Sequence, residues 1–248
     1  MGGTLIVTGA SRGIGTATAL LAAHAGYAVG VVYAQRRDRA EAVVATIRVG
    51  GGRALALQAD VMDDGAVCAV FDRATAELGP LTALVTNAGI TGPLGPLATV
   101  EMATVRRVLD VNVVGTLLCA REAIRRMART AGGAGGAIVT VSSRAAQYGS
   151  PGEFVHYAAS KAAIETATIG LAREVAAEGI RVNCVSCGFM DTEMHAAAGD
   201  AGRLTRAVAQ VPLQRAGRSE EAARAILWLL SDAASYSTGA IVAVSGGR

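Results

Sequence analysis

Aromatic residues are scarce in this chain of 248 residues, at 4% of the composition, and charged residues reach only 17%. No basic tract points to a nucleic-acid partner, and no acidic tail points to a solvated, disordered segment. No apolar run reaches the roughly 18 residues that a membrane-spanning helix needs. We therefore expect neither a nucleic-acid partner nor a membrane segment.

Cysteine and histidine are also few, with four and three residues. Four cysteines in a chain of this length do not form the disulfide framework of a small secreted domain. Cys184 and Cys187 have the spacing of a redox or zinc motif, but no second pair accompanies them and the histidines do not cluster. We expect reduced cysteines and no metal site. Since no signal peptide is recognisable, we also expect a cytoplasmic location.

What the chain does contain is apolar residues, at 52% of the composition, arranged in short runs between helical patterns. The runs predicted as strands cover residues 4–8, 27–33, 55–59, 81–86, 137–141, 180–185 and 240–244. A long helix is predicted over about residues 101–129, with Asn112 in its middle. Continuously apolar strands alternating with helices predict a Rossmann-type α/β fold, with a doubly wound parallel sheet of about seven strands and helices on both faces. No linker or repeat divides the chain, so we expect one domain over residues 1–248.

A glycine-rich loop follows the first predicted strand and precedes a helix. Its residues are Gly9, Ala10, Ser11, Arg12, Gly13, Ile14 and Gly15. Glycines let the backbone approach a pyrophosphate, and the helix N-terminus presents free N–H groups to it. This order of elements favours a dinucleotide site over a plain tight turn.

Tyr157 and Lys161 lie four residues apart in a predicted helix, so both side chains are on one face. An unperturbed tyrosine has a pKa of about 10, and a nearby cation favours the phenolate. The pair is therefore a candidate general acid and base, although this spacing is common on solvated helices. Asp60, Asn87, Ser143 and Gly188 each follow a predicted strand, and we expect them at the same edge of the sheet.

In combination these motifs resemble the short-chain dehydrogenase/reductase family, from the glycine loop through Asn87-Ala88-Gly89, Asn112, Ser143 and Tyr157-x-x-x-Lys161 to Gly246-Gly247. The chain looks most like glucose-1-dehydrogenase-like and 3-oxoacyl-carrier-protein reductase-like members. The resemblance implies that Tyr157 is the acid or base and that Lys161 binds the nicotinamide ribose and lowers the pKa of Tyr157. It also implies that Ser143, with Ser142 as its rival, binds the substrate oxygen, and that Asn112 holds a water.

The resemblance further implies a set of cofactor contacts and a homotetramer. Asp60 and Val61 would flank the adenine, and Thr192 would contact the carboxamide. The segment 188–218 would bind a small-molecule substrate. The remaining cofactor contacts would come from Gly9, Ser11, Arg12, Gly13, Ile14, Gly15, Asn87, Ala88, Gly89, Tyr157, Lys161 and Gly188.

The end of the second predicted strand favours NADP(H) over NAD(H). An acidic residue there would bind the ribose hydroxyls of NAD, but the position is Tyr33. Arg12, Arg36 and Arg37 lie nearby, and arginine forks suit a phosphate. A solvated helix start is the alternative for Arg36 and Arg37, and NAD(H) stays possible.

We therefore expect an NADP(H)-dependent oxidoreductase that transfers a hydride between nicotinamide and a carbonyl or secondary alcohol. A sugar dehydrogenase is one alternative, and a catalytically silent dinucleotide-binding protein is another. Cys187 stands where the family has proline, which would lack an N–H donor and fix φ. We expect Cys187 to lie in a partly exposed, reactive loop and Cys184 to be shielded within the strand.

Overall fold

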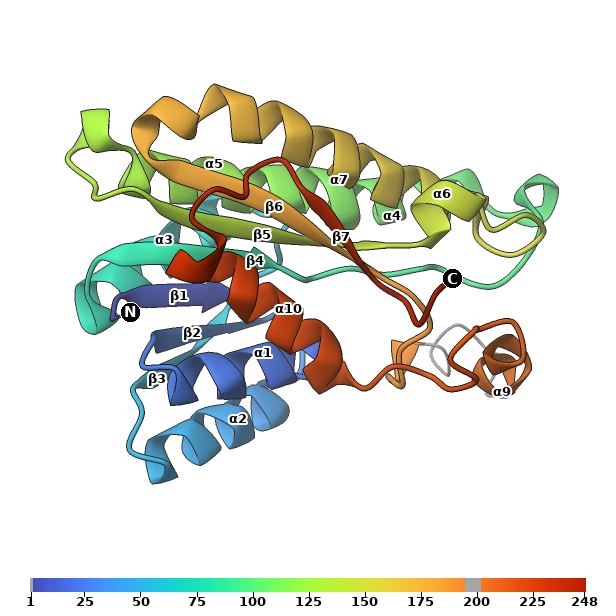
Figure 1. The fold of residues 1–248 in the computed structure, drawn as a ribbon, viewed down its shortest axis with the longest axis horizontal. Helices are drawn as coiled ribbons and strands as arrows, with labels where there is room; N and C mark the ends of the chain where they lie inside the picture. Colours follow the sequence, from blue (N-terminus) through green and yellow to red (C-terminus); the bar gives the residue numbers. More distant parts are fainter. Residues whose placement is uncertain (1, 195–201) are drawn as a thin grey trace.

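Seven parallel strands form one sheet in the order β3-β2-β1-β4-β5-β6-β7 in the computed structural model, which describes residues 2–194 and 202–248 (Figure 1). The strands are β1 (Thr4–Val7), β2 (Ala28–Tyr33), β3 (Ala54–Gln58), β4 (Leu81–Thr86), β5 (Gly136–Ser143), β6 (Ile180–Cys187) and β7 (Ile241–Val244). The prediction of a doubly wound parallel sheet is therefore confirmed.

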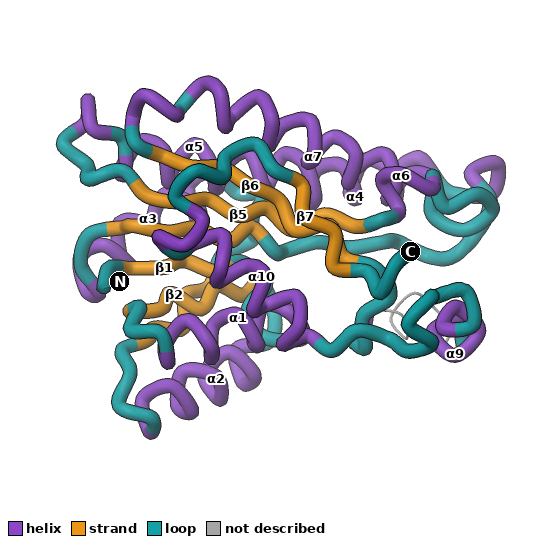
Figure 2. Tube along the Cα trace, in the orientation of Figure 1, coloured by secondary structure: helices purple, strands orange, loops and turns teal. Residues whose placement is uncertain are grey.

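Helices cover both faces of the sheet, so the strands lie in the middle layer (Figure 2). Helices α1 (Gly13–His24), α2 (Arg37–Val49) and α10 (Ser219–Leu230) lie on one face. The other face carries α3 (Asp64–Leu78), α4 (Met102–Leu109), α5 (Gly115–Met127) and α7 (Val155–Glu174). The short helix α6 (Ala145–Tyr148) follows β5, and the short helix α9 (Arg203–Val208) precedes α10.

The core consists of two apolar layers, one on each side of the sheet. Successive side chains of a strand point to opposite faces, so Leu5 belongs to the layer under α1 and α10, and Ile6 to the layer under α3 and α5. Both residues are fully buried. This burial on both faces explains why the strands have continuously apolar sequences.

The helix expected over residues 101–129 is interrupted by one π-helical turn, Asp110–Val114, between α4 and α5. Single π turns inside α-helices frequently occur at functional sites. This turn contains Asn112, whose side chain is buried and bonded to the segment after β4. The sequence pattern predicted the helix but not the π turn.

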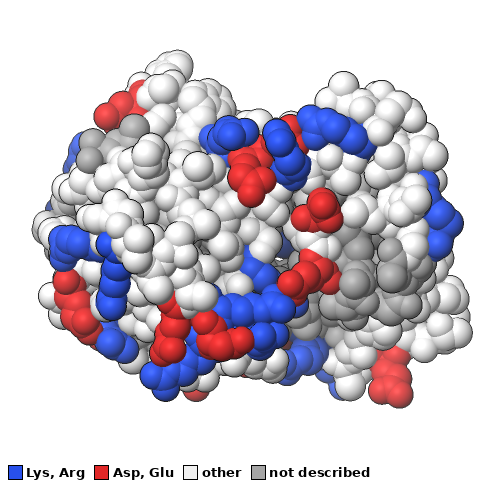
Figure 3. All heavy atoms as spheres, turned by 90° about the horizontal axis from the view of Figure 1, so that it is seen from below, with Lys and Arg blue, Asp and Glu red and all other residues white. Residues whose placement is uncertain are grey.

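Strand order reverses between β1 and β4, which lie side by side although β2 and β3 separate them in the chain. Ligands of open α/β sheets bind beyond the carboxyl ends of the strands at such a switch point. None of the described helices combines the length and apolar character that a membrane span requires. On the face shown in Figure 3, basic and acidic side chains are interspersed and do not form a patch of one sign.

Candidate active site

A cavity of about 650 Å³ lies beyond the carboxyl ends of the strands. Its walls come from the glycine loop after β1, the ends of β2 and β4 to β6, the start of α7 and the segment after β6. Most of the predicted site residues line it, namely Gly9, Ser11, Arg12, Gly13, Ile14, Arg36, Asp60, Val61, Asn87, Ala88, Gly89, Ser143, Tyr157, Lys161, Gly188 and Thr192. Gly15, Arg37 and Asn112 do not line it.

The glycine loop adopts a backbone that side chains would obstruct. Gly9 and Gly13 have φ angles of +63° and +55°, in the left-handed region that favours glycine. A Cβ on Gly15 would lie 2.4 Å from the carbonyl oxygen of Gly9, so the first turn of α1 packs directly against the loop. The loop thus brings backbone N–H groups and the positive end of α1 to the cavity.

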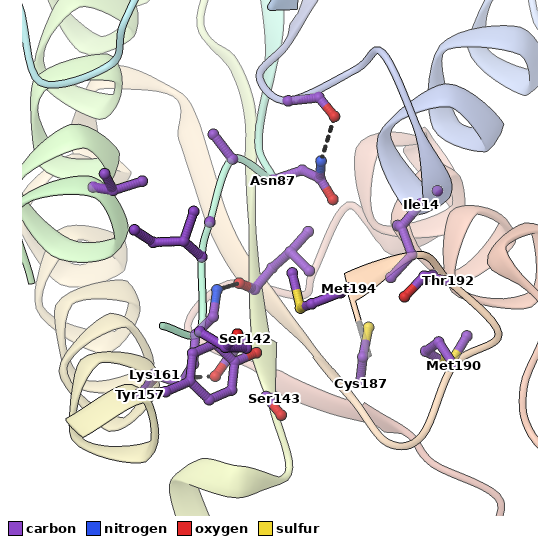
Figure 4. Close-up of a pocket in the computed structure, with 18 of the residues that line it drawn as sticks. Ile14, Asn87, Ser142, Ser143, Tyr157, Lys161, Cys187, Met190, Thr192 and Met194 are labelled. Carbon is purple, nitrogen blue, oxygen red and sulfur yellow. Dashed lines mark hydrogen bonds between the residues drawn. The ribbon is translucent and has the colours of Figure 1, made fainter. Parts of the chain in front are cut away.

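Asn87 fastens the glycine loop to the end of β4. Its side-chain amide donates to the carbonyl oxygens of Thr8 and Gly9, each at 3.0 Å (Figure 4). The Thr8 hydroxyl accepts from the backbone N–H groups of Asn87 and Ala88, also at 3.0 Å. These bonds hold together the two loops that flank the switch point.

Tyr157 and Lys161 lie on one face of α7, both buried, with Lys161 Nζ 5.8 Å from the centroid of the Tyr157 ring. The ammonium donates to the carbonyl oxygen of Val141 at 2.7 Å. Burial lowers the pKa of Lys161, because removal from water penalises the charged form. The spacing of the two residues in sequence thus places a desolvated amine beside a phenol.

Asn112 makes three hydrogen bonds through its side chain. It accepts from the N–H of Ile90, and donates to the carbonyl oxygen of Ile90 and to the Ser160 hydroxyl, each at 2.9 Å. A Cβ on Gly89 would lie 3.2 Å from Asn112 Oδ1 and 3.5 Å from Lys161 Nζ. Asn112 therefore ties the Gly89–Ile90 segment to α7 immediately beside the lysine.

The two serines at the end of β5 have different surroundings. Ser142 is buried, and its hydroxyl donates to the Lys161 carbonyl oxygen and the Glu165 carboxylate, at 3.1 and 3.0 Å. Ser143 is partly exposed to the cavity, and its hydroxyl accepts from the N–H of Ala145 at 3.2 Å. Because Ser142 is engaged with α7, Ser143 has the hydroxyl better placed for a ligand.

Three arginines surround the Glu193 carboxylate at one end of the cavity. Arg39 Nη1 donates to both carboxylate oxygens, at 2.6 and 2.7 Å, and Arg12 Nη1 lies 3.8 Å away. The hydrogen bond from Arg39 and the charges of Arg39, Arg12 and Arg36 lower the pKa of Glu193. The sequence gives no sign that Arg39 belongs here, because only its contact with Glu193, a residue of another loop, brings it to the site.

Arg36 and Arg37 point to different places. Arg36 lines the cavity and pairs with Asp38 at 2.7 Å. Arg37 pairs with Glu41, also at 2.7 Å, and its side chain is 74% exposed. Arg37 therefore lies outside the cavity, because the first turn of α2 directs it to solvent, and its contact with the cofactor stays a prediction.

The segment after β6 closes the cavity opposite Tyr157, and Figure 4 shows Cys187, Thr192 and Met194 on that side. A Cβ on Gly188 would lie 2.7 Å from Ser245 Cα, so glycine is required where the chain leaves the sheet. A Cβ on Gly13 would lie 3.4 Å from Thr192 Cγ2, so Thr192 packs over the glycine loop. Within the expected substrate segment 188–218, residues 195–201 lie outside the described residues.

Cys187 is not in an exposed loop, so that expectation is wrong. β6 continues to Cys187, which pairs in register with Ser143 of β5 and is 6% exposed. Burial raises the pKa of its thiol to about 12, which keeps it protonated and unreactive near neutral pH. Cys184 is fully buried, as expected.

Comparison with known proteins agrees with this geometry. A family model described as Enoyl-(Acyl carrier protein) reductase matches residues 9–248. An Escherichia coli protein named uncharacterized oxidoreductase YgfF is 54% identical over 246 residues, covering 98% of each chain. The chain belongs to the short-chain dehydrogenase/reductase family. As a member of that family it is an oxidoreductase that acts on CH–OH groups, as the resemblance implied.

Two further members of the short-chain dehydrogenase/reductase family are informative. The cis-4-hydroxycyclohexanecarboxylate dehydrogenase of Sinomonas cyclohexanicum is 44% identical, over 98% of this chain and 94% of its own. The crystal structure of a short-chain dehydrogenase from Burkholderia cenocepacia in complex with NADP has a TM-score of 0.92 and 34% identity. Its alignment covers 100% of this chain and 98% of that one.

Proposed function

We propose that this enzyme transfers a hydride between NADP(H) and a carbonyl or secondary alcohol, with Tyr157 as the acid or base. The observation that carries the proposal is the buried Lys161 ammonium beside the Tyr157 ring, in the cavity that the glycine loop also lines. Burying a cation is costly, and ionisable groups perturbed by burial cluster at functional sites. Because the cation lies beside a glycine loop typical of dinucleotide sites, we infer that the pair serves proton transfer coupled to hydride transfer.

The residues present fit a dinucleotide cofactor. Gly9, Gly13 and Gly15 leave room where side chains would fill the cradle, and α1 points its N-terminus at the same place. Asp60 and Val61 lie at the wall where an adenine would stack beyond β3. Bound there, a nicotinamide dinucleotide supplies or accepts the hydride.

Preference for the 2′-phosphorylated cofactor is supported by the arginines around Glu193. A carboxylate already lies between Arg12 and Arg39, which shows that these guanidinium groups converge on a point suited to an anion. The NADP complex of the Burkholderia relative gives independent support. Glu193 would compete with a 2′-phosphate for the same arginines, so NAD(H), which lacks that phosphate, is the alternative cofactor.

Proton transfer is assigned to the residues around Tyr157. In the reductive direction its phenol would donate a proton to the substrate oxygen, and in the oxidative direction the phenolate would remove it. The Lys161 ammonium would favour the phenolate, which is the role that the family resemblance implies for this lysine. Ser143 would donate a hydrogen bond to the substrate oxygen as negative charge develops, and Asn112 would position a water near Lys161.

The test is a panel of ketones, 3-oxoacyl thioesters, enoyl thioesters and aldoses. Each compound is offered with NADPH and with NADH or, for oxidation, with NADP⁺ and with NAD⁺, and nicotinamide absorbance is followed. The proposal expects cofactor turnover with a ketone or its alcohol, faster with NADP(H) than with NAD(H). Turnover of an aldose alone would establish a sugar dehydrogenase. If cofactor binds, as measured by its fluorescence, and no compound is turned over, a silent binding protein is the better account.

A further inference from the structure

Glu165 is a buried carboxylate at the proposed active site, and the proton transfer assigned to Tyr157 does not use it. The residue is 8% exposed, does not line the cavity, and lies one turn beyond Lys161 on the same face of α7. Its Oε1 accepts hydrogen bonds from the Ser142 and Ser186 hydroxyls, at 3.0 and 2.9 Å. A carboxylate out of water is costly unless hydrogen bonds and an opposite charge compensate it. The two hydroxyls meet the first need, and Lys161 meets the second.

The hydrogen bonds of Glu165 join three elements that each carry a residue of the site. Ser142 of β5 and Ser186 of β6 are paired in register, and both donate to the same carboxylate oxygen on α7. Ser143 directly follows the first serine, and Gly188 leaves the sheet two residues after the second. Because the carboxylate fixes the two strand ends relative to α7, it also fixes Ser143 relative to the phenol and the amine on that helix.

Glu165 also supplies negative charge close to Lys161. Burial lowers the pKa of Lys161, and the charges of Cys184, Cys187 and Glu165 act in the opposite direction. The two thiols, on β6, have pKa values raised by burial to about 11 and about 12, so they are neutral near pH 7. In the described part of the chain the other titratable group beside the amine is Tyr157, which is neutral as a phenol. The Glu165 carboxylate is thus the group that balances the ammonium.

We propose that Glu165 is a positioning residue for the reaction, which balances the Lys161 ammonium and fixes the ends of β5 and β6 against α7. It lies outside the cavity and acts through Lys161 and Ser143. Removal of its charge makes the ammonium easier to deprotonate, because a nearby opposite charge favours the charged form. The inference rests on the proposed function, since the charge of Lys161 matters to the reaction only if Tyr157 and Lys161 perform the proton transfer.

A direct readout exists because Lys161 is the only lysine among the 248 residues. Enzyme isotopically labelled at lysine Cε therefore gives a single lysine signal in NMR spectra, and its chemical shift against pH gives the pKa of Lys161 without cofactor or turnover. An unperturbed lysine has a pKa of about 10.4. The wild-type value should lie below this, and Glu165→Gln should lower it further by about one pH unit.

The variants separate the charge of Glu165 from its shape. Glu165→Gln keeps an oxygen to which both serine hydroxyls can donate, so it removes the charge and retains the shape. Glu165→Met also removes the charge at similar volume, and should lower the pKa of Lys161 likewise if Glu165→Gln does not fold. Glu174→Gln removes an equal charge from an exposed position on the same helix, and should leave the pKa of Lys161 unchanged.

The pH dependence of kcat distinguishes this role from a merely structural one. With the fastest carbonyl substrate of the panel, reduction needs the charged lysine, so kcat of Glu165→Gln should begin to fall at a pH about one unit lower than in wild type. A purely structural role would lower kcat by the same factor at every pH.

Two results would overturn the inference. One is the same pKa of Lys161 in the wild type and in whichever of Glu165→Gln and Glu165→Met folds. The other is a pH profile of kcat that keeps its position in the variant. Since the NMR titration involves no hydride transfer, failure of the proposed function would be seen separately, as absence of turnover in the substrate panel.

Discussion

Lys161 shows how the surroundings of a single residue decide its chemistry. Burial lowers its pKa, and the nearby thiols of Cys184 and Cys187 have pKa values raised to about 11 and about 12. Both thiols are therefore neutral near pH 7 and cannot balance the ammonium. Glu165, one helical turn further along α7, accepts hydrogen bonds from Ser142 and Ser186 and is the carboxylate that favours the charged lysine.

Cys187 should resist alkylation in the native enzyme. A thiol with a pKa of about 12 has almost no reactive thiolate near pH 8, and the side chain is buried. Mass spectrometry after brief iodoacetamide treatment should find the partly exposed Cys68 modified first, and Cys187 modified only after unfolding. Rapid modification of Cys187, with loss of activity, would show that the end of β6 opens in solution.

Arg39→Gln should weaken NADPH binding and leave NADH binding nearly unchanged. Only NADPH carries the 2′-phosphate, and loss of one hydrogen bond between charged groups predicts an increase of about 10-fold in KM for NADPH. Arg37→Gln is the matched control, since that arginine pairs with Glu41 outside the cavity. An equal change for both cofactors in Arg39→Gln would mean that Arg39 only supports the loop through Glu193.

At the scale of helices and strands, most of the architecture could be predicted from the sequence, and the ends of elements could not. The apolar run predicts a strand to residue 185, but backbone pairing with β5 extends β6 to Cys187. Helical periodicity predicts one helix over residues 101–129, but the structure has a π turn inside it. That turn contains Asn112, whose side chain is hydrogen-bonded to the distant Ile90. Both differences come from contacts with distant segments, which local patterns do not contain.

The contact between α5 and α3 contains a buried carboxylate with several cations. Glu122 is 3% exposed and pairs with Arg126 at 2.6 Å and Arg125 at 2.9 Å, and Arg126 also pairs with Asp72 of α3. Burial raises the pKa of Glu122, but the hydrogen bond and charge of Arg126, with the neighbouring arginines, outweigh it and lower the pKa overall. The ionised form therefore stabilises the fold.

Glu122→Gln should lower the free energy of unfolding by about 1–3 kcal/mol at pH 7, because hydrogen bonds to charged groups are lost. Since the folded pKa is depressed, the contribution of Glu122 is present above its unfolded pKa and disappears as the pH falls through the folded value. Urea unfolding of variant and wild type should thus converge in acid. Glu77→Gln is the control, because it removes one partner of an exposed ion pair on α3. It should change the free energy of unfolding little at any pH. If the free energies of unfolding of wild type and Glu122→Gln differed by the same amount at every pH, the stabilisation would not come from the ionised carboxylate.

At the scale of the whole molecule, the family and the parallel sheet could be predicted because their motifs follow the chain in order. The contact of Arg39 with Glu193 could not, since it joins residues that are 154 positions apart. Arg37 and Arg39 differ only in which side of α2 they occupy. The sequence shows the charges, and only the fold shows that Arg39 pairs with Glu193 in the wall of the cavity and that Arg37 does not.

We expect the enzyme to form a tetramer in solution, as the family resemblance implies. Met102 of α4, Leu117 of α5 and Val114 between them are 59%, 40% and 44% exposed, and apolar side chains gathered along one helical segment favour an interface. Light scattering should give four chain masses at micromolar concentration, and Leu117→Glu should reduce that mass. Val49→Glu, on α2, is the control for added charge. A monomeric wild type would contradict this expectation.

The measurement that tests the central claim most directly is the turnover of Tyr157→Phe with NADPH and the fastest carbonyl substrate of the panel. The account predicts that kcat falls by about 10²- to 10⁴-fold, because the proton donor is lost. The Kd for NADPH, measured by fluorescence titration of the same variant, should stay within a few-fold, because the glycine loop and the arginines are untouched. A variant with near-normal kcat would show that Tyr157 is not the acid.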